Sequence, residues 1–387
     1  MEQPSSVDNP VTAAKVRVLS VIGSLRPGGA ETYVTNVTRA IRAHGVHMEI
    51  CALERTGPLL DPLLRDGVTV YDTPFPRRPS RLNSLRMLRT VSALRRIIAA
   101  GRFDVVHTYL YSADLVGVTA ARLARCPRVI ISRQAMHGWV HRPGRVRHGL
   151  EQASIRFANE VVACSNAALR DAEASERALP RVRTVIYNAV DVHQYRPTQI
   201  RLDGPLRLLT VGALAHRKGQ EYAIEALAQV RRAGVDAVLE LVGAGPDEAM
   251  LRRLVAEAGL GDAVVFAGQH ADPRPHLASA DVFLLPSRQE GFSVALLEAM
   301  ACSMPAIATD VGGNAEALVD GKGGRVVPAL RPAAIAAAIA ELARNRAGLA
   351  QMGDFNRGRV TELFSIEVSA RRLADWYLGG PVRAADA

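Results

Sequence analysis

The sequence predicts an α/β protein made of two doubly wound domains in tandem. The chain has 387 residues, more than the roughly 100 to 200 of a typical single domain. Short, almost continuously apolar runs alternate with segments of helical periodicity, the pattern of parallel sheets covered by helices on both faces. The alternation begins again after the polar segment 195–207, which holds two prolines and a glycine. We therefore expect domains at residues 1–196 and 197–364.

The expected strands are short and are separated by helical segments in both halves. In the first half they lie at 15–23, 47–53, 68–73, 103–110, 128–134, 160–165 and 183–188, and in the second at 206–214, 237–245, 263–268, 280–287, 305–311 and 324–328. Helical periodicity is clearest at 30–45, 112–125 and 332–344. A last helical segment at 364–380 carries Trp376 and Tyr377, whose rings need a surface to pack on.

Composition favours a soluble protein of a reducing compartment. No run of about 18 apolar residues occurs, so no membrane span is expected, and residues 1–18 lack the basic and apolar regions of a signal peptide. The cysteines are scattered without close pairing, at Cys51, Cys126, Cys164 and Cys302. We interpret all four as small core hydrophobes and expect a cytoplasmic location.

Positive charge is concentrated in the first half of the chain. Residues 1–200 hold 28 Lys and Arg against 16 Asp and Glu, whereas residues 201–387 hold 20 against 22. This favours an anionic partner such as a membrane surface or a lipid phosphate, with an Arg-rich soluble surface as the alternative. Nucleic acid is disfavoured because interleaved aromatic residues are lacking.

One amphipathic segment, 80–102, contributes much of that charge. Its arginines are Arg81, Arg86, Arg89, Arg95 and Arg96. It could lie on an anionic membrane. A helix that covers the sheet and exposes a solvated basic face is the slightly favoured alternative.

Two places in the first half could carry chemistry, since ligands of doubly wound sheets bind at the carboxyl ends of the strands. Gly28 and Gly29 follow the first strand and open a helix, where the backbone can approach an anion, although a plain turn is the alternative. The pattern is not GxGxxG, so a dinucleotide site is disfavoured. His107 ends the strand DVVH and could face the cleft as a sugar ligand or proton carrier, or be structural.

Zinc binding is disfavoured. His137, His141 and His148 lie in one stretch, but glycine and proline interrupt any helix there and no cysteine or carboxylate lies near in sequence. The neighbouring arginines Arg142, Arg145 and Arg147 make a basic loop on the acceptor side the better interpretation.

In the second half, cations follow the first strand and two acids flank a helix start. His216, Arg217 and Lys218 can hold a diphosphate as it leaves, and Lys218 stands out because the chain has only three lysines. In EGFSVALLEAMA, Ser293 is the expected N-cap, with Glu290 in the loop and Glu298 on the second helical turn. On these grounds alone the acids could be the paired carboxylates of a glycosidase.

The order of motifs resembles glycosyltransferase family 4, nucleotide-sugar-dependent retaining enzymes of the GT-B fold. The motifs are GGAE, DVVHT, VIYNAVD, VGAL with RKG, LVGAGP, VFAG, ADVFLLPSRQEGFSVALLEAMA and ATDVGGNAEALVDG. They cover almost the whole chain, and the two glutamates with GGNAE downstream are the most specific part. The resemblance implies two Rossmann-like domains facing each other across a cleft, with the helix at 365–387 packing back on the first.

The resemblance also implies roles for individual residues. Glu290 would bind hydroxyls of the donor sugar, Glu298 the ribose hydroxyls, and Lys218 the diphosphate. His107 would approach the reacting sugar, so the implied catalytic set is His107, Lys218 and Glu290. The implied donor site also contains Gly28, Gly29, Gly212, Arg217, Gly243, Gly291, Phe292, Ser293 and Val294. No cofactor is expected, and no metal, because no DxD motif occurs.

Three positions depart from the family pattern. Ala213 replaces an arginine that would partner Lys218, and Arg217 or His216 could substitute for it. Ser293 replaces a glycine, which leaves the backbone N–H groups in place. Tyr109 replaces a histidine on the acceptor side.

The expected function is retaining transfer of a sugar, from a UDP-sugar in the first instance, to a hydroxyl of a cell-envelope, polysaccharide or lipid-linked glycan. The basic first domain would hold the acceptor's phosphate or the inner face of the membrane. The alternatives are a nucleotide-sugar epimerase or phosphorylase of the same fold, and a non-catalytic sugar-nucleotide-binding module that Ala213 would permit.

Overall fold

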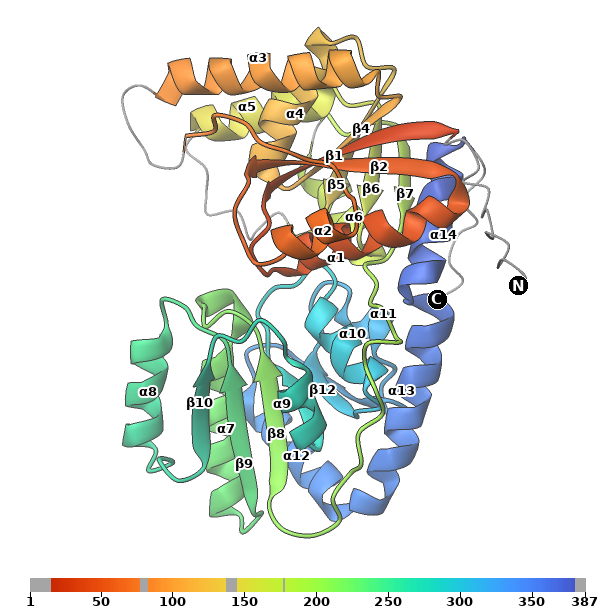
Figure 1. The fold of residues 1–387 in the computed structure, drawn as a ribbon. Coiled ribbons are helices and arrows are strands. Elements are labelled where there is room, and N and C mark those ends of the chain that lie inside the picture. Colours follow the sequence, from red (N-terminus) through yellow and green to blue (C-terminus); the bar gives the residue numbers. More distant parts are fainter. Residues whose placement is uncertain (1–14, 77–82, 137–144, 177, 380–387) are drawn as a thin grey trace, which may run out of the picture.

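The computed structural model describes residues 15–76, 83–136, 145–176 and 178–379, which form two parallel sheets with helices on both faces (Figure 1). The first sheet has the order β3-β2-β1-β4-β5-β6-β7 and the second β10-β9-β8-β11-β12-β13. In both, the order reverses at the first strand of the domain, which is the doubly wound topology that the sequence predicts.

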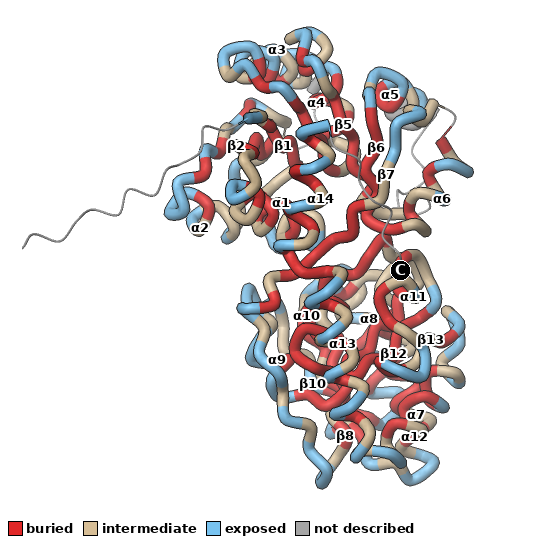
Figure 2. Tube along the Cα trace, turned by 90° about the vertical axis from the view of Figure 1, so that its right-hand side faces the viewer, coloured by how far each residue is buried: buried red, intermediate tan, exposed pale blue. Residues whose placement is uncertain are grey.

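The strands follow the predicted runs closely. The first sheet consists of β1 (Val16–Ser24), β2 (Val46–Glu54), β3 (Val70–Tyr71), β4 (Val105–Tyr109), β5 (Arg128–Arg133), β6 (Glu160–Ala163) and β7 (Val182–Val185). The second consists of β8 (Leu206–Val211), β9 (Ala237–Val242), β10 (Val264–Gly268), β11 (Val282–Leu285), β12 (Ala306–Thr309) and β13 (Gly324–Val327). Their buried residues form the core between the helical layers, as the red segments of Figure 2 show.

The helices connect these strands. Those of the first domain are α1 (Gly29–Ala40), the 3₁₀ turn η1 (Ile41–His44), α2 (Leu60–Arg65), α3 (Asn83–Gly101), α4 (Tyr111–Leu123), α5 (Arg145–Arg156) and α6 (Asn166–Ser175). Those that follow are η3 (His216–Lys218), α7 (Gln220–Arg232), α8 (Glu248–Glu257), α9 (Arg274–Ser279), α10 (Val294–Ala301), α11 (Asn314–Ala317), α12 (Pro332–Arg344), η4 (Arg346–Gly348), α13 (Leu349–Leu363) and α14 (Ile366–Tyr377).

The last helix, α14, returns from the second domain and packs on the first (Figure 1). The Tyr33 hydroxyl lies 2.9 Å from Oγ of Ser369, and the Arg128 guanidinium donates to the backbone carbonyls of Trp376 and Tyr377 at 3.0 and 2.6 Å. Tyr377 is buried in the first-domain core and Trp376 is partly buried against it. The rings thus have the surface that the sequence requires for them.

All four cysteines are buried and free, which confirms that they are core residues. Among the described residues, no helix is both long and apolar enough to cross a bilayer. The domain limits at residues 196 and 364 stay predictions.

Candidate active site

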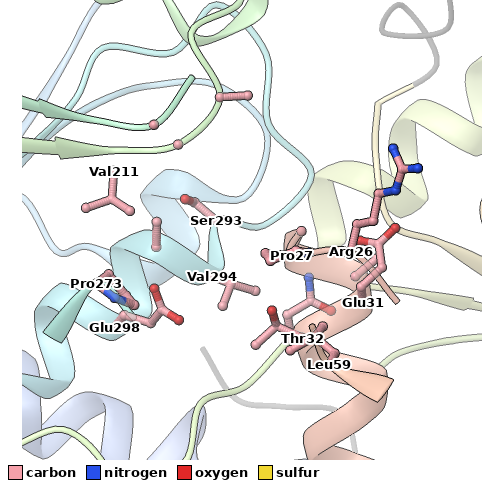
Figure 3. A pocket seen from close by; sticks show the side chains of 18 of the residues that line it. Arg26, Pro27, Glu31, Thr32, Leu59, Val211, Pro273, Ser293, Val294 and Glu298 are labelled. Atoms are coloured by element: carbon pink, nitrogen blue, oxygen red, sulfur yellow. The ribbon is translucent and has the colours of Figure 1, made fainter. Parts of the chain in front are cut away.

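A cleft of about 990 Å³ lies between the two domains, beside the carboxyl ends of β1 and β8. Residues of α10, among them Ser293, Val294 and Glu298, line one side, and the start of α1 with Glu31 and Thr32 lines the other (Figure 3). The cleft therefore occupies the place where doubly wound sheets bind ligands.

Two glycine turns bring the backbone of the second domain to the cleft. Gly212 after β8 and Gly243 after β9 have φ of 152° and 145°, a region that favours glycine. A Cβ on Gly243 would lie 2.0 Å from the carbonyl oxygen of Gly212, so no side chain fits between the two turns. Gly212 and Gly243 are both predicted donor-site residues, and both line the cleft.

Lys218 and Glu290 form an ion pair at the cleft wall. The Lys218 Nζ lies 2.5 Å from Oε1 of Glu290, and the Ser287 hydroxyl donates to the same oxygen at 2.7 Å. The side chains of Lys218 and Glu290 are only 14% and 9% exposed. A largely desolvated ammonium beside the glycine turns can attract a diphosphate, because Coulomb attraction strengthens away from water.

Arg217 also lines the cleft, whereas the exposed His216 does not. Burial lowers the pKa of Arg217, and the Glu290 carboxylate opposes that shift. Ala213, the position where the resemblance implies an arginine, lines the cleft as well. Of the two predicted substitutes for that arginine, the structure places only Arg217 in the cleft.

Helix α10 presents Glu298 to the cleft. Ser293 caps the helix, its Oγ accepting from the backbone N–H of Leu296 at 3.4 Å, and this confirms the predicted N-cap. Glu298 is buried on the second turn, where the Tyr195 hydroxyl donates to its Oε1 at 2.7 Å. Burial raises the pKa of Glu298 to about 7, although the Tyr195 hydrogen bond opposes this.

The loop between the two acids is held by the first domain. The Gly291 carbonyl accepts from the Ser165 hydroxyl at 2.9 Å, and the Phe292 carbonyl accepts from Nδ2 of Asn188 at 3.3 Å. A Cβ on Gly291 would lie 2.4 Å from the carbonyl oxygen of Gln134, so the domains touch through backbone here. Domain arrangement and the position of Glu290 are thereby coupled.

Glu316 forms a second connection between the domains. Its carboxylate accepts from the backbone N–H groups of Asn166 and Ala167 at 2.9 and 2.7 Å and from the Tyr187 hydroxyl at 2.9 Å. These N–H groups open helix α6 of the first domain, where a negative charge is stabilised by the helix dipole. The glutamate of GGNAE therefore docks one domain on the other.

Glu316→Ala is expected to speed amide hydrogen exchange at Asn166 and Ala167 by about tenfold or more, because loss of a charge-assisted hydrogen bond costs about 1.5–3 kcal/mol. Residue-resolved exchange measured by NMR or by mass spectrometry with fragmentation checks this. Glu362→Ala, at an exposed position of α13, is the matched control. Equal exchange in both variants would mean that other contacts protect the start of α6.

The glycines at the start of α1 lie beside the second domain. Gly28 and Gly29 both line the cleft, and a Cβ on Gly29 would contact Val294 of α10 at 3.5 Å. Together with Gly291, Phe292, Ser293 and Val294 they bring the remaining predicted donor-site residues into the same cleft.

The structure corrects the prediction that His107 faces the cleft. His107 is the central residue of β4 and not its last, it is only 1% exposed, and it does not line the cleft. Its Nδ1 lies 2.6 Å from the Tyr377 hydroxyl, and its ring stacks on Tyr109 with centroids 4.4 Å apart. Burial lowers the pKa of His107 to about 3, so the imidazole is neutral. It contacts α14 in the core and cannot touch a sugar in this cleft, and Tyr109 is buried with it.

The metal interpretation gains nothing from the structure. His137 and His141 lie outside the described residues, as does the side chain of His148. Among the side chains that are described, no group of three or more His, Cys, Asp and Glu could hold a metal ion.

Several residues of the site escape sequence reasoning. Ser287 and Tyr195 orient the two glutamates, and Asn188 holds the Phe292 carbonyl. Tyr195 lies in the polar segment that predicts a linker, so nothing in its neighbourhood indicates a partner about a hundred residues away. Ser287 could have been predicted from the sequence, because it follows a buried strand and lies three residues before Glu290.

Comparison with known proteins identifies both halves of the chain. Residues 27–194 match the model described as Glycosyltransferase Family 4, and residues 205–345 match that described as Glycosyl transferases group 1. The GDP-mannose-dependent alpha-(1-6)-phosphatidylinositol monomannoside mannosyltransferase of Mycobacterium tuberculosis is 32% identical over 311 residues, 74% of this chain and 78% of that protein. The 2-deoxystreptamine glucosyltransferase of Streptomyces kanamyceticus is 29% identical over 348 residues, 81% and 87% of the two chains.

Solved structures show the same fold. Alr3699/HepE of Anabaena, crystallised in complex with UDP, has a TM-score of 0.79 at 22% identity and covers 94% of this chain and 100% of its own. Sucrose-phosphate synthase of Thermosynechococcus elongatus has a TM-score of 0.79 at 22% identity, covering 94% and 98%.

Proposed function

Because the chain belongs to glycosyltransferase family 4 and has the GT-B fold, we propose that it transfers a hexose from a nucleoside diphosphate sugar to a hydroxyl of a glycan or lipid-linked acceptor, with retention of configuration. The leaving diphosphate sits against Lys218 and the N-terminus of α10. As the sugar leaves, this phosphate helps to deprotonate the acceptor hydroxyl on the same face. No residue of the chain is required as general base.

The observation that carries the proposal is the convergence of Lys218, Glu290 and Glu298 in one cleft. Glu298 accepts hydrogen bonds from ribose hydroxyls and Glu290 from sugar hydroxyls. Lys218 offsets the charge that grows on the diphosphate, since preorganised cations stabilise charge that develops in the transition state. The arrangement does not suit a glycosidase. Lys218 holds the Glu290 carboxylate, which in a glycosidase would have to act as acid or nucleophile.

The nucleobase of the donor is to be identified by experiment. A UDP-sugar is the expectation that came with the family resemblance, and the structural relative from Anabaena is described in complex with UDP. The relative at 32% identity is described as GDP-mannose-dependent. Thermal shifts with UDP-, GDP- and ADP-hexoses decide between them, because a ligand that binds only the native state raises stability by mass action.

Product analysis tests the reaction itself. With a radiolabelled donor of the base so identified, a new α-linked glycoside supports transfer with retention when the donor is α-linked. Epimerisation, phosphorolysis or hydrolysis as the sole reaction would favour the alternative enzymes of this fold. Binding of nucleotide without any turnover would favour a binding module.

We further propose that α3 docks the enzyme on an anionic membrane. The helix buries Leu94 and Ile98 against the first domain but leaves Leu85 and Leu88 58% and 66% exposed. Arg86 and Arg89, next to these leucines in the sequence, are exposed as well, and α3 lies on the outside of the domain (Figure 2). An exposed apolar pair beside basic residues fits a surface of anionic headgroups.

Reversing both charges, in Arg86→Glu with Arg89→Glu, is expected to weaken binding to vesicles containing phosphatidylglycerol by at least about thirtyfold, since each basic residue contributes about 1 kcal/mol near such a surface and the new carboxylates add repulsion. Vesicle sedimentation at about 0.1 M salt measures this. Arg232→Glu with Arg344→Glu, at exposed helical positions of the second domain, is the control. Equal loss in both pairs would show only a general charge effect.

A further inference from the structure

The first-domain wall of the cleft is built from one face of helix α1. Residues at helical spacing along this face line the cleft: Glu31, Thr32, Thr35, Asn36 and Arg39. Most of these are hydroxyl, amide or carboxylate side chains, and Figure 3 shows Glu31 and Thr32 across the cleft from α10. The donor is assigned to the opposite wall and to the glycines at the start of α1, so the side chains along the rest of this face are available to the acceptor.

Of the arginines on this wall, Arg39 is held in an ion pair. The Nε of Arg39 lies 2.5 Å from Oδ2 of Asp66 on the loop after α2, and both residues line the cleft. Arg26 is exposed at the start of the loop before α1, where water and salt screen its charge. No ion pair of Glu31 is found in the part of the chain that the structure describes, and burial raises the pKa of this carboxyl group.

Two residues that line the same cleft each have a buried polar atom that lacks a hydrogen-bond partner. Within the described residues, Oγ1 of Thr35 and Oδ1 of Asn188 have no hydrogen-bond partner, although both residues are only 2% exposed. The orientation of the Asn188 amide is fixed, because its Nδ2 faces the carbonyl oxygen of Phe292. A buried polar atom without a partner costs free energy. The Asn188 oxygen can only accept, so it requires a ligand that donates, whereas the Thr35 hydroxyl can accept or donate.

From these contacts we infer that the α1 wall binds an acceptor sugar or cyclitol through its hydroxyl or ammonium groups, and that Glu31 selects against an acceptor phosphorylated at this position. The inference rests on the proposed transferase function. A hydroxyl or ammonium donates to Glu31, Thr35 and Asn188, whereas a phosphate would bring a second negative charge beside an unpaired carboxylate. This inference differs from the sequence expectation that the basic first domain holds an acceptor phosphate, which stays a prediction.

The test compares three matched acceptors: methyl glucoside, glucosamine and glucose 6-phosphate. The assay is release of nucleoside diphosphate from the donor, above the rate without acceptor, with the full-length protein. We expect stimulation by the neutral and amino sugars and at least about tenfold lower kcat/KM for the phosphate, since one repelled or lost charge-assisted hydrogen bond is equivalent to a factor of ten or more.

Glu31→Gln separates recognition from structure, because it keeps the shape and one accepting oxygen but removes the charge. It is expected to reduce the preference for glucosamine over methyl glucoside by about tenfold, with an unchanged Kd for the nucleotide. Asp61→Asn, an exposed carboxylate of α2 outside the cleft, is the matched control and should keep the wild-type preference.

Each outcome decides a different claim. A wild-type preference for glucose 6-phosphate, an amino-to-neutral ratio that Glu31→Gln does not change, or no stimulation by any of the three while nucleotide binds would each overturn the acceptor assignment. Failure to bind any nucleotide sugar would instead overturn the proposed function.

Discussion

Glu290→Gln is expected to lower kcat by about 100- to 1000-fold, the size of effect found when one preorganised polar contact to a transition state is lost, while the Kd for the nucleoside diphosphate changes by less than about threefold. The amide still fits the space beside the Ser287 hydroxyl, which lies 2.7 Å from Oε1. It no longer pairs with Lys218 or accepts strongly from sugar hydroxyls. The defect therefore appears in turnover, because the groups proposed to bind the nucleotide, Glu298, Lys218 and the backbone N–H groups, are all kept in the variant.

Lys218→Ala should give a loss of similar size, and the double variant should be far less damaging than the product of the two. Lys218 and Glu290 are in contact, so their effects are coupled and not additive. Initial rates with saturating donor, combined with calorimetric titration of the nucleotide, measure both quantities. Glu257→Gln, on the exposed face of α8, is the control. Equal losses in nucleotide affinity and in kcat would place Glu290 in nucleotide binding instead.

Much of the fold and part of the site could be predicted from the sequence. Strand alternation locates both sheets because buried parallel strands are apolar along their whole length. Glu290, Glu298 and Lys218 stand next to strand ends, and local signals such as the Ser293 cap place them correctly. These predictions succeed because each depends on residues close together in the chain.

Predictions fail where the deciding neighbour lies far away in sequence. His107 was correctly placed on a strand, but β4 continues for two residues beyond it, and its Nδ1 contacts Tyr377, which comes 270 residues later. Tyr195 lies 103 residues before the glutamate that it orients. The net charge of the first half likewise gives no location: its arginines are exposed on α3, while Arg39 in the cleft is paired with Asp66.

The second large effect concerns Glu298 and pH. Burial raises the pKa of its carboxyl from 4.5 to about 7, so the folded protein binds this proton more tightly than the unfolded chain. The associated stability is fully present below about pH 4.5 and is lost as pH rises through about 7. Glu298→Gln removes this dependence, so the stability of the variant relative to wild type should increase across that interval.

Nucleotide affinity should show the opposite trend. Ribose hydroxyls donate to the ionised carboxylate more strongly than to a protonated one, so the wild-type Kd should fall as pH rises from 6 to 8, around the pKa of about 7. Glu298→Gln should bind about tenfold or more weakly at the upper end, as expected for loss of a charge-assisted hydrogen bond. Calorimetric titration of both proteins with the same nucleotide isolates Glu298, because the phosphate titrates equally in each experiment.

Tyr195→Phe connects this behaviour to the structure. The Tyr195 hydroxyl stabilises the ionised carboxylate, so its removal should move the midpoint of the affinity change to higher pH without abolishing it. A structural role of Tyr195 alone would lower affinity equally at every pH. Parallel curves for wild type and Glu298→Gln would show that Glu298 does not titrate with binding, and would remove it from the ribose site.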